Sequence, residues 1–375
     1  MSSALLRRPA GRCLAIIQAV LLCIAGVLFF GNPAVAAASP GTVLAATSAT
    51  LPPELSPLAT AKRITYATTT VAGAATTTTG LVITPKTGKK SQVVVWGHGT
   101  TGLADKCAPS TYLDVFWPEA RAAIAALLGK GWTVAAPDYP GLGTAAAHPY
   151  LIGMSEARSM IDSVKAARNL DSSLSTQYAI DGHSQGGQGA LFAGQLAPSY
   201  DGSLVLRGVS AIAPVSNVDM LAPAIPGTPG QGYLVMGLYG LNAQDSTFIP
   251  NTYLAATAKQ KTSVLQTGCL NEILAAYSAL TADELLVGGA LPDSVVTKLA
   301  GYDNPAQSAP SAPMLIVQGT ADESVPYDIT AGPLLAELSA YSQPVTFVPV
   351  EGADHDQAVV QTVDTVAAWI AARFA

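Results

Sequence analysis

The sequence predicts an α/β fold with a mostly parallel central sheet and helices on both faces. Strand-like apolar runs alternate with helical segments from residue 65 to residue 212, the pattern typical of such a sheet. One run, residues 92–96 (QVVVW), is almost continuously apolar, as expected of a strand buried on both faces. The alternation stops after residue 214 and resumes at residues 314–317 (MLIV). An insertion between two late strands is therefore expected.

The hydrophobic periodicity and the length of each segment predict the individual strands and helices. Residues 65–70 and 81–84 are expected to form antiparallel opening strands. Further strands are expected at 92–96, 132–136, 178–181, 205–212, 314–317 and 345–350, with helices at 119–128, 155–167, 188–196 and 359–373. Residues 39–60, rich in Ala, Ser, Thr and Pro, predict a flexible N-terminal lead-in over 37–60.

The insertion, residues 215–308, contains helical Ala/Leu pieces and a Gly/Pro-rich part. It falls at the carboxyl edge of the sheet, where a cap over a site would lie. The predicted division is a core of residues 61–214 and 309–375 with a cap of 215–308. Tyr233, Leu234, Val235, Met236, Leu238 and Tyr239 could line an acyl pocket, although core packing is the commoner explanation for this spacing.

Residues 1–36 have the character of a secretory signal peptide. Three arginines precede an apolar stretch, and Ala34-Val35-Ala36 offers a small-x-small cleavage site. The alternative is a retained membrane anchor, because the apolar run is almost long enough to span a bilayer. We expect cleavage near Ala36 and a secreted protein, extracellular or in the cell envelope, without stable membrane insertion.

Charge and cysteine content exclude several classes of function. Cleavage would remove three arginines and no acidic residue, so the net charge would change from −6 to −9. An acidic surface argues against nucleic acid as a partner. Only Cys107 and Cys269 would remain, and in an exported protein they are expected to form a disulfide rather than stay as two buried free thiols. Four histidines without an H-E-x-x-H motif make catalytic zinc improbable.

The central chemical motif is Gly182-His183-Ser184-Gln185-Gly186, a G-x-S-x-G sequence. A strand (YAID) precedes it and a small-residue helix follows it, as in the turn that presents the nucleophile of the α/β-hydrolase fold. Glycines on both sides of the serine permit the tight turn. We therefore expect Ser184 to be a nucleophile; the alternative is a glycine-rich helix start without chemistry.

A serine nucleophile needs a base and an orienting carboxylate, which follow it in the order acid, then histidine, in this fold. His355 is the only histidine after Ser184, so we expect it to be the base. Asp322, at the end of an expected strand, is the predicted acid, and Asp219 is the alternative. Neighbouring acids such as Asp354 and Asp356 lie too close in sequence to orient the base.

Acyl transfer also needs backbone donors for the developing oxyanion. One is expected from Gln185, at the start of the helix after the nucleophile. The other is expected from the glycine-rich loop 97–102 (GHGTTG), with Thr100 preferred and Thr101 as the alternative. An ordinary strand-end turn would also explain the loop.

A competing motif is Gly141-Leu142-Gly143-Thr144-Ala145-Ala146, which matches G-x-G-x-x-A and is followed by Asp162 about 20 residues later, as in dinucleotide-binding proteins. Pro140 and the His148-Pro149 pair argue against it, because the last glycine could not open a helix directly. A nicotinamide cofactor is therefore not expected.

Several strings together resemble the secretory lipase family of α/β-hydrolases, in a bacterial form: WGHGTTG, DKCAPS, APDYPGLG, HPYL, DGHSQGGQGA and GTADESVPY. The resemblance spans residues 60–375. It implies triacylglycerol lipase or carboxylesterase activity, a helical cap, and no cofactor. By motif position it also assigns the triad to Ser184, Asp322 and His355, and the oxyanion donors to Gln185 and Thr100.

The predicted function is hydrolysis of a small-molecule or lipid ester through an acyl-enzyme. An acyltransferase would use the same triad and differ only in the acceptor. A peptidase would need a charged anchor for a chain terminus, and the sequence offers none that we can locate. A binding protein on a hydrolase scaffold would be favoured by a missing triad residue, and all three are present.

Overall fold

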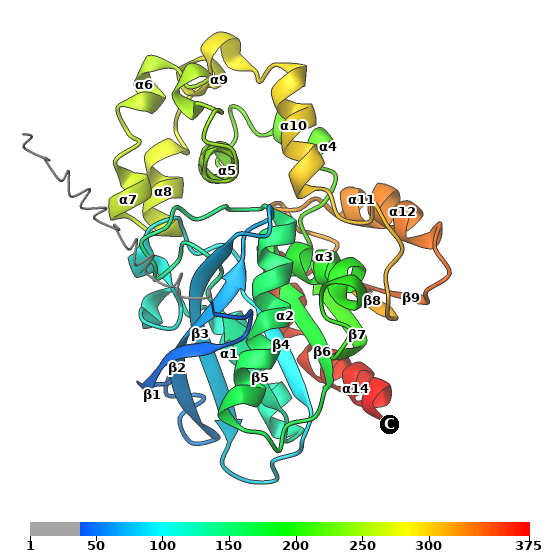
Figure 1. Cartoon of the computed structure of the whole chain (residues 1–375). Helices are drawn as coiled ribbons and strands as arrows, with labels where there is room; N and C mark the ends of the chain where they lie inside the picture. Colours follow the sequence, from blue (N-terminus) through cyan, green and yellow to red (C-terminus); the bar gives the residue numbers. More distant parts are fainter. Residues whose placement is uncertain (1–37) are drawn as a thin grey trace, which may run out of the picture. The chain divides into compact units, whose positions relative to one another are not determined.

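The computed structural model describes residues 38–375, so the predicted signal peptide and its cleavage site lie outside the described residues. Residues 38–375 form one compact unit around a nine-stranded sheet (Figure 1). The strand order is β1-β2-β3-β5-β4-β6-β7-β8-β9. No helix in this part of the chain is long and apolar enough to cross a membrane.

The sheet is mixed. Its opening strands pair antiparallel with one another and, through β3, with β5: β1 (Val43–Ala49), β2 (Ala59–Thr69), β3 (Ala75–Pro85). The other six strands run parallel: β4 (Val93–Gly97), β5 (Thr133–Pro137), β6 (Gln177–His183), β7 (Val205–Ile212), β8 (Met314–Gly319), β9 (Val345–Val350). The predicted α/β fold with a mostly parallel sheet is confirmed.

Helices cover both faces because the central strands are apolar on both sides. In β4, Val93 and Val95 contact one apolar cluster, whereas Val94 and Trp96 contact another on the opposite face. The first cluster is covered by α2 (Gly153–Leu170) and α3 (Gln185–Tyr200), and the second by α1 (Pro118–Gly129) and α14 (Val363–Phe374).

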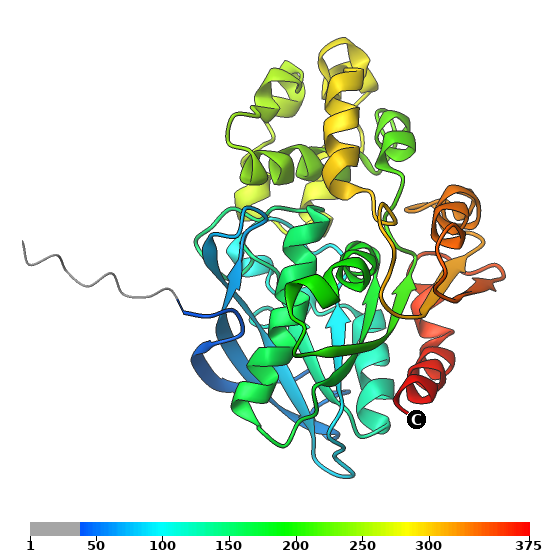
Figure 2. The same ribbon diagram turned by 45° about the vertical axis from the view of Figure 1, so that its right-hand side comes forward.

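The insertion between β7 and β8 is helical and lies at the carboxyl ends of the parallel strands (Figures 1 and 2). Only an isolated bridge between Leu254 and Leu286 has strand character within it. Its helices enclose an apolar cluster of their own. They are α4 (Val218–Ala224), α5 (Gln231–Gln244), α6 (Ala256–Lys259), α7 (Val264–Thr267), α8 (Leu270–Tyr277), α9 (Ala282–Leu285) and α10 (Asp293–Asp303). The helical insertion is thus confirmed, while its limits as a separate domain stay a prediction.

Two expectations need correction. The lead-in 37–60 is not loose throughout, because β1 pairs with the open edge of the 11-residue β2. Most of the β1 side chains are exposed, which is why the segment lacks an apolar period. The expected helix 359–373 is two helices, α13 (Gln357–Val360) and α14. Between them the Thr362 hydroxyl donates to the carbonyl of Ala358 (2.6 Å), a local bond that competes with regular helix geometry.

Candidate active site

Ser184 lies in the turn between β6 and α3, with φ 56° and ψ −118°. A non-glycine residue in this conformation is strained, and such strain is typical of functional sites. The flanking glycines are sterically required: a Cβ at Gly182 would lie 2.2 Å from the carbonyl oxygen of Gly186, and one at Gly186 would lie 2.1 Å from that of Gly97. The motif therefore forms the strand–turn–helix that exposes a nucleophile in this fold.

His355 and Asp322 lie at the same edge of the sheet, after β9 and β8 respectively. The Nδ1 of His355 is 2.7 Å from Oδ2 of Asp322. The other carboxylate oxygen accepts from the backbone N–H groups of Ser324 (2.8 Å) and Val325 (2.9 Å). The alternative acid, Asp219, lies in α4 and accepts instead from the side chain of Asn304 (2.7 Å).

His183 links the nucleophile turn to the loop of His355. Its Nε2 is 3.1 Å from the backbone carbonyl oxygen of His355, and the two imidazole rings are 4.5 Å apart. Burial, together with the nearby His355, holds the pKa of His183 well below its usual range. The ring is therefore neutral and donates its Nε2 proton to that carbonyl.

The loop after β4 lies against this turn. A Cβ on Gly99 would be 3.5 Å from Cβ of Ser184. Neither Thr100 nor Thr101 has an acceptor for its backbone N–H within residues 38–375. Gln185 is the first residue of α3, so its N–H has no intrahelical acceptor either. These amides are available to an oxyanion, and the choice between Thr100 and Thr101 stays a prediction.

A cluster of buried polar side chains surrounds the side chain of Gln185 and was not predicted from the sequence. The side-chain Nε2 of Gln185 lies 2.8 Å from Oε1 of Glu156 and 3.1 Å from Nε2 of His148. Burial raises the pKa of Glu156 to about 8 and lowers that of His148 to about 4. Both side chains are thus neutral at pH 7. The HPYL string carries His148, but nothing in its composition indicates these partners.

Acidic groups surround His355 as well. Burial, reinforced by the charge of Asp356, raises the pKa of Glu119 to about 7. The cap contributes Tyr233, whose pKa is raised to about 12 by burial and by the charges of Asp356 and Asp322. A role of Tyr233 in an acyl pocket stays a prediction. Among the others, Leu234, Val235, Met236 and Leu238 are buried in the cap's own apolar cluster, as core packing predicts.

One group among the described residues has the composition of a metal site: His183, His355 and Asp356, whose candidate ligand atoms all lie within 4.8 Å of one another. Two of its nitrogens are already engaged, since Nε2 of His183 faces the His355 carbonyl and Nδ1 of His355 faces Asp322. We assign no metal to this group.

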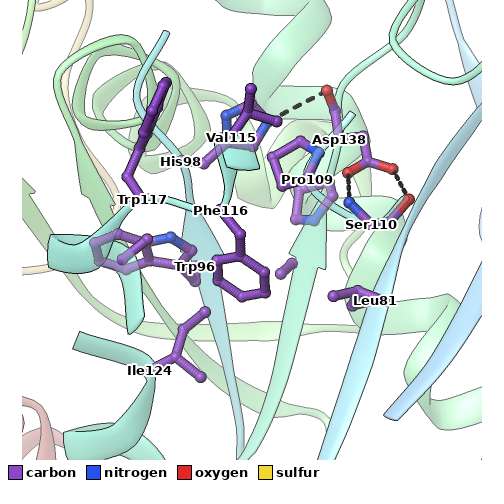
Figure 3. Close-up of a pocket in the computed structure, with 13 residues that line it drawn as sticks. Leu81, Trp96, His98, Pro109, Ser110, Val115, Phe116, Trp117, Ile124 and Asp138 are labelled. Atoms are coloured by element: carbon purple, nitrogen blue, oxygen red, sulfur yellow. Dashed lines mark hydrogen bonds between the residues drawn. The ribbon is translucent and has the colours of Figure 1, made fainter. Parts of the chain in front are cut away.

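A small apolar cavity lies between α1 and the sheet, next to His98 (Figure 3). Its volume of about 10 Å³ admits roughly one water molecule, so it is no acyl pocket. On its wall, Asp138 accepts from the backbone N–H of Ser110 (2.9 Å) and the hydroxyl of Thr79 (2.6 Å). Desolvation raises the pKa of Asp138. The Asp138 side chain thus links the segments of Thr79 and Ser110 by hydrogen bonds.

The G-x-G-x-x-A segment does not open a helix, because α2 begins only at Gly153. Asp162, the expected ribose-binding acid, is buried and accepts from the hydroxyls of Thr68 and Tyr200, each at 2.7 Å. The features of a dinucleotide site are therefore absent from this segment.

Cys107 and Cys269 form a disulfide, as predicted. It joins the loop after β4 to the N-terminus of α8 in the cap. Next to it, the backbone N–H of Leu270 donates to the carbonyl of Thr101 (2.8 Å). The cap is thus attached both covalently and by hydrogen bonding to the loop that carries Thr100.

Comparison with known proteins identifies the family of the chain. The profile of the secretory lipase family matches residues 117–375. This chain belongs to the secretory lipase family. The match includes α3, the loops of Asp322 and His355 and the whole cap, but it begins after the loop 97–102.

Relatives of this secretory lipase family member include fungal enzymes. Secreted triacylglycerol lipase LIP4 of Malassezia globosa is 28% identical over 273 residues, which cover 68% of this chain and 59% of the relative. Secreted triacylglycerol lipase LIP7 of the same organism is 27% identical over 319 residues, covering 77% and 66%. The chain thus spans about three fifths to two thirds of these curated relatives.

Solved structures show the same fold. Candida antarctica lipase A matches with a TM-score of 0.71 at 20% identity, covering 85% of this chain and 78% of the lipase. The rice cell wall degrading esterase LipA from Xanthomonas oryzae also matches with a TM-score of 0.71, at 21% identity, covering 90% and 98%. The α/β-hydrolase fold predicted for this secretory lipase family member is therefore confirmed.

Proposed function

We propose that the chain is a secreted carboxylic-ester hydrolase that acts through an acyl-enzyme on Ser184. The observation that carries the proposal is the 2.7 Å contact between His355 and Asp322, in a loop that His183 ties directly to the turn of Ser184. Family membership and the printed names of the relatives, secreted triacylglycerol lipases, support the reaction class and the export of the protein.

In the proposed mechanism, Ser184 Oγ attacks the ester carbonyl carbon while Nε2 of His355 accepts its proton. The carbonyl oxygen becomes an oxyanion, which the N–H groups of Gln185 and Thr100 stabilise. Collapse of the intermediate breaks the ester bond, and the imidazolium returns the proton to the departing alkoxide. Water then attacks the acyl-enzyme by the same route, which releases the carboxylic acid and restores Ser184.

Asp322 has the environment that this role needs. It holds the Nδ1 proton of His355 and stabilises the imidazolium that forms in each step. Its carboxylate is held in turn by two backbone amides and by Nε2 of Gln318 (2.8 Å). These three donors fix the carboxylate in position.

We further propose esters of short to medium acyl chains as substrates, with no metal or nucleotide requirement. The test is a panel of p-nitrophenyl esters from short to long acyl chains, combined with labelling by an organophosphonate ester. We expect hydrolysis, one phosphonate per chain, and its location on Ser184 by peptide mass mapping. Labelling at another residue, or cleavage of peptides but not esters, would refute the proposal.

A Ser184→Ala variant supplies the kinetic test. Because triad residues act as a unit, we expect kcat to fall by roughly 10⁴- to 10⁶-fold. A change confined to KM would instead mean that the serine only contributes to binding.

A further inference from the structure

Thr100 has a side-chain partner that lies outside the loop. Its Oγ1 is 2.8 Å from the phenol oxygen of Tyr150, and both residues are buried. The backbone carbonyl of Thr100 accepts from Nε1 of Trp117 (3.2 Å). Side chain and carbonyl are thus both held, while no acceptor for the backbone N–H is present within the described residues. The Trp117 bond orients the peptide that joins Thr100 to Thr101, and the Tyr150 bond fixes the side chain of Thr100, whose own N–H remains free.

We propose that Tyr150 is a positioning residue for the oxyanion site and that it acts through Thr100. The inference rests on the proposed function and adds a residue to it. An oxyanion donor is effective only when it is held within about 0.5 Å of its productive position by its supporting contacts. The phenol of Tyr150 supplies such a contact without touching the substrate.

The cap in turn fixes the position of Tyr150. Gly240 of α5 lies so close that a Cβ there would be 2.3 Å from the carbonyl oxygen of Tyr150 and 2.8 Å from its nitrogen. Tyr150 also belongs to the apolar cluster of the cap, with Val235 and Leu238. Tyr150 therefore contacts α5 through its backbone and Thr100 through its phenol.

The segment that carries Tyr150 also contacts Gln185, the second proposed oxyanion donor. The carbonyl of His148 accepts from the backbone N–H of Tyr150 (2.9 Å), and the ring of His148 lies 3.1 Å from the side-chain nitrogen of Gln185. One short segment thus contacts both residues expected to bind the oxyanion. Burial raises the pKa of Tyr150 well above its usual range, so the phenol keeps its proton.

The experiment compares Tyr150→Phe, Thr100→Val and the double variant, each as the mature full chain. For Tyr150→Phe we expect kcat to fall roughly tenfold, with KM within about twofold, because a lost orienting hydrogen bond affects the transition state alone. The affinity for a trifluoromethyl ketone, which forms a tetrahedral adduct, should fall by a similar factor. The pH midpoint of kcat should not move, because His355 is unaffected.

The double variant decides whether Tyr150 acts through Thr100. If it does, adding Tyr150→Phe to Thr100→Val causes no further loss, since the two residues share one interaction. The matched control is Tyr66→Phe, which removes another buried phenol, one that donates to the carbonyl of Ser159 (2.8 Å) away from the loop. We expect this control to lose some stability and to keep its kcat.

Three outcomes would overturn the inference: unchanged kcat and inhibitor affinity in Tyr150→Phe, fully additive losses in the double variant, or an equal kcat loss in Tyr66→Phe. Should Tyr150→Phe fail to fold, Thr100→Val alone must show the loss of kcat and inhibitor affinity for the inference to stand. Failure of the proposed function is distinguishable, because it would appear as missing phosphonate labelling of Ser184 in the unmodified chain.

Discussion

The imidazole of His183 donates from Nε2 to the backbone carbonyl of His355, 3.1 Å away. The residue next to the proposed nucleophile therefore holds the main chain of the proposed base. The two lie 172 residues apart in the chain, and only the adjacency of their loops at one sheet edge brings them together. This contact leads directly to the first prediction.

Replacing His183 by Ala should lower kcat by roughly five- to tenfold, because one neutral hydrogen bond that fixes the His355 loop is lost. A His183→Gln variant, which can present a donor from a similar position, should recover part of the loss. Steady-state kinetics with a p-nitrophenyl ester measure both. Equal activity of the Ala variant and the unmodified chain would mean that the loop is held by other contacts.

Asp322→Asn should reduce kcat on the order of 10⁴-fold, because an amide cannot hold His355 in the required tautomer. Asp219→Asn is the matched control, since this exposed carboxylate contacts Asn304 rather than the imidazole of His355. We expect it to retain most of its activity. A larger loss in Asp219→Asn than in Asp322→Asn would transfer the acid role to α4.

Glu156→Gln should remove a pH-dependent loss of stability. The pKa of Glu156 is about 8 in the folded state and about 4.5 in the unfolded state. Between these two pH values the folded chain binds more protons than the unfolded chain, so the free energy of unfolding falls as the pH rises. The Gln side chain stays neutral throughout. The Tm of the variant relative to the unmodified chain should therefore be higher at pH 8.5 than at pH 4.5.

His148, whose pKa is lowered to about 4, has the opposite dependence between about pH 4 and 6.5. It is present in both chains of that comparison, so its contribution cancels in the difference. A Tm difference that is the same at both pH values would show that Glu156 is not buried as a neutral acid.

Removal of the disulfide by Cys107→Ala and Cys269→Ala should destabilise the fold by up to about 5 kcal/mol, the loop-closure value for a separation of 162 residues. Urea unfolding under non-reducing conditions measures the difference. Reductant should destabilise the unmodified chain and leave the double variant unaffected. Thiol titration of the unfolded, unreduced protein should find no free thiol at either position.

EDTA should leave the rate of ester hydrolysis unchanged. The one metal-like group among residues 38–375 uses Nε2 of His183 and Nδ1 of His355 for hydrogen bonds that the proposed mechanism needs. A rate that is lost with EDTA and restored by a divalent cation would contradict the proposed mechanism and would show that this group binds a metal.

Local patterns in the sequence determined much of this protein. The apolar run at residues 92–96, the alternation of elements and the strand–glycine–serine–glycine–helix order predicted the α/β fold and the turn at Ser184, because each depends on neighbours in the chain. The order of chain positions also selected His355 and Asp322 as candidates. Edge strand β1 escaped detection because its side chains are mostly exposed and carry no apolar period.

Only the tertiary structure decided which distant groups touch. The hydrogen bond from His183 to His355, the pairing of Thr100 with Tyr150 and the burial of Glu156 beneath Gln185 join segments that are 29 to 172 residues apart. Nothing in the local sequence encodes them, since a His, Tyr or Glu has the same local preferences whether it ends in solvent or in a core. Their roles follow from burial, which removes water as a competing partner and makes each remaining hydrogen bond decisive for position.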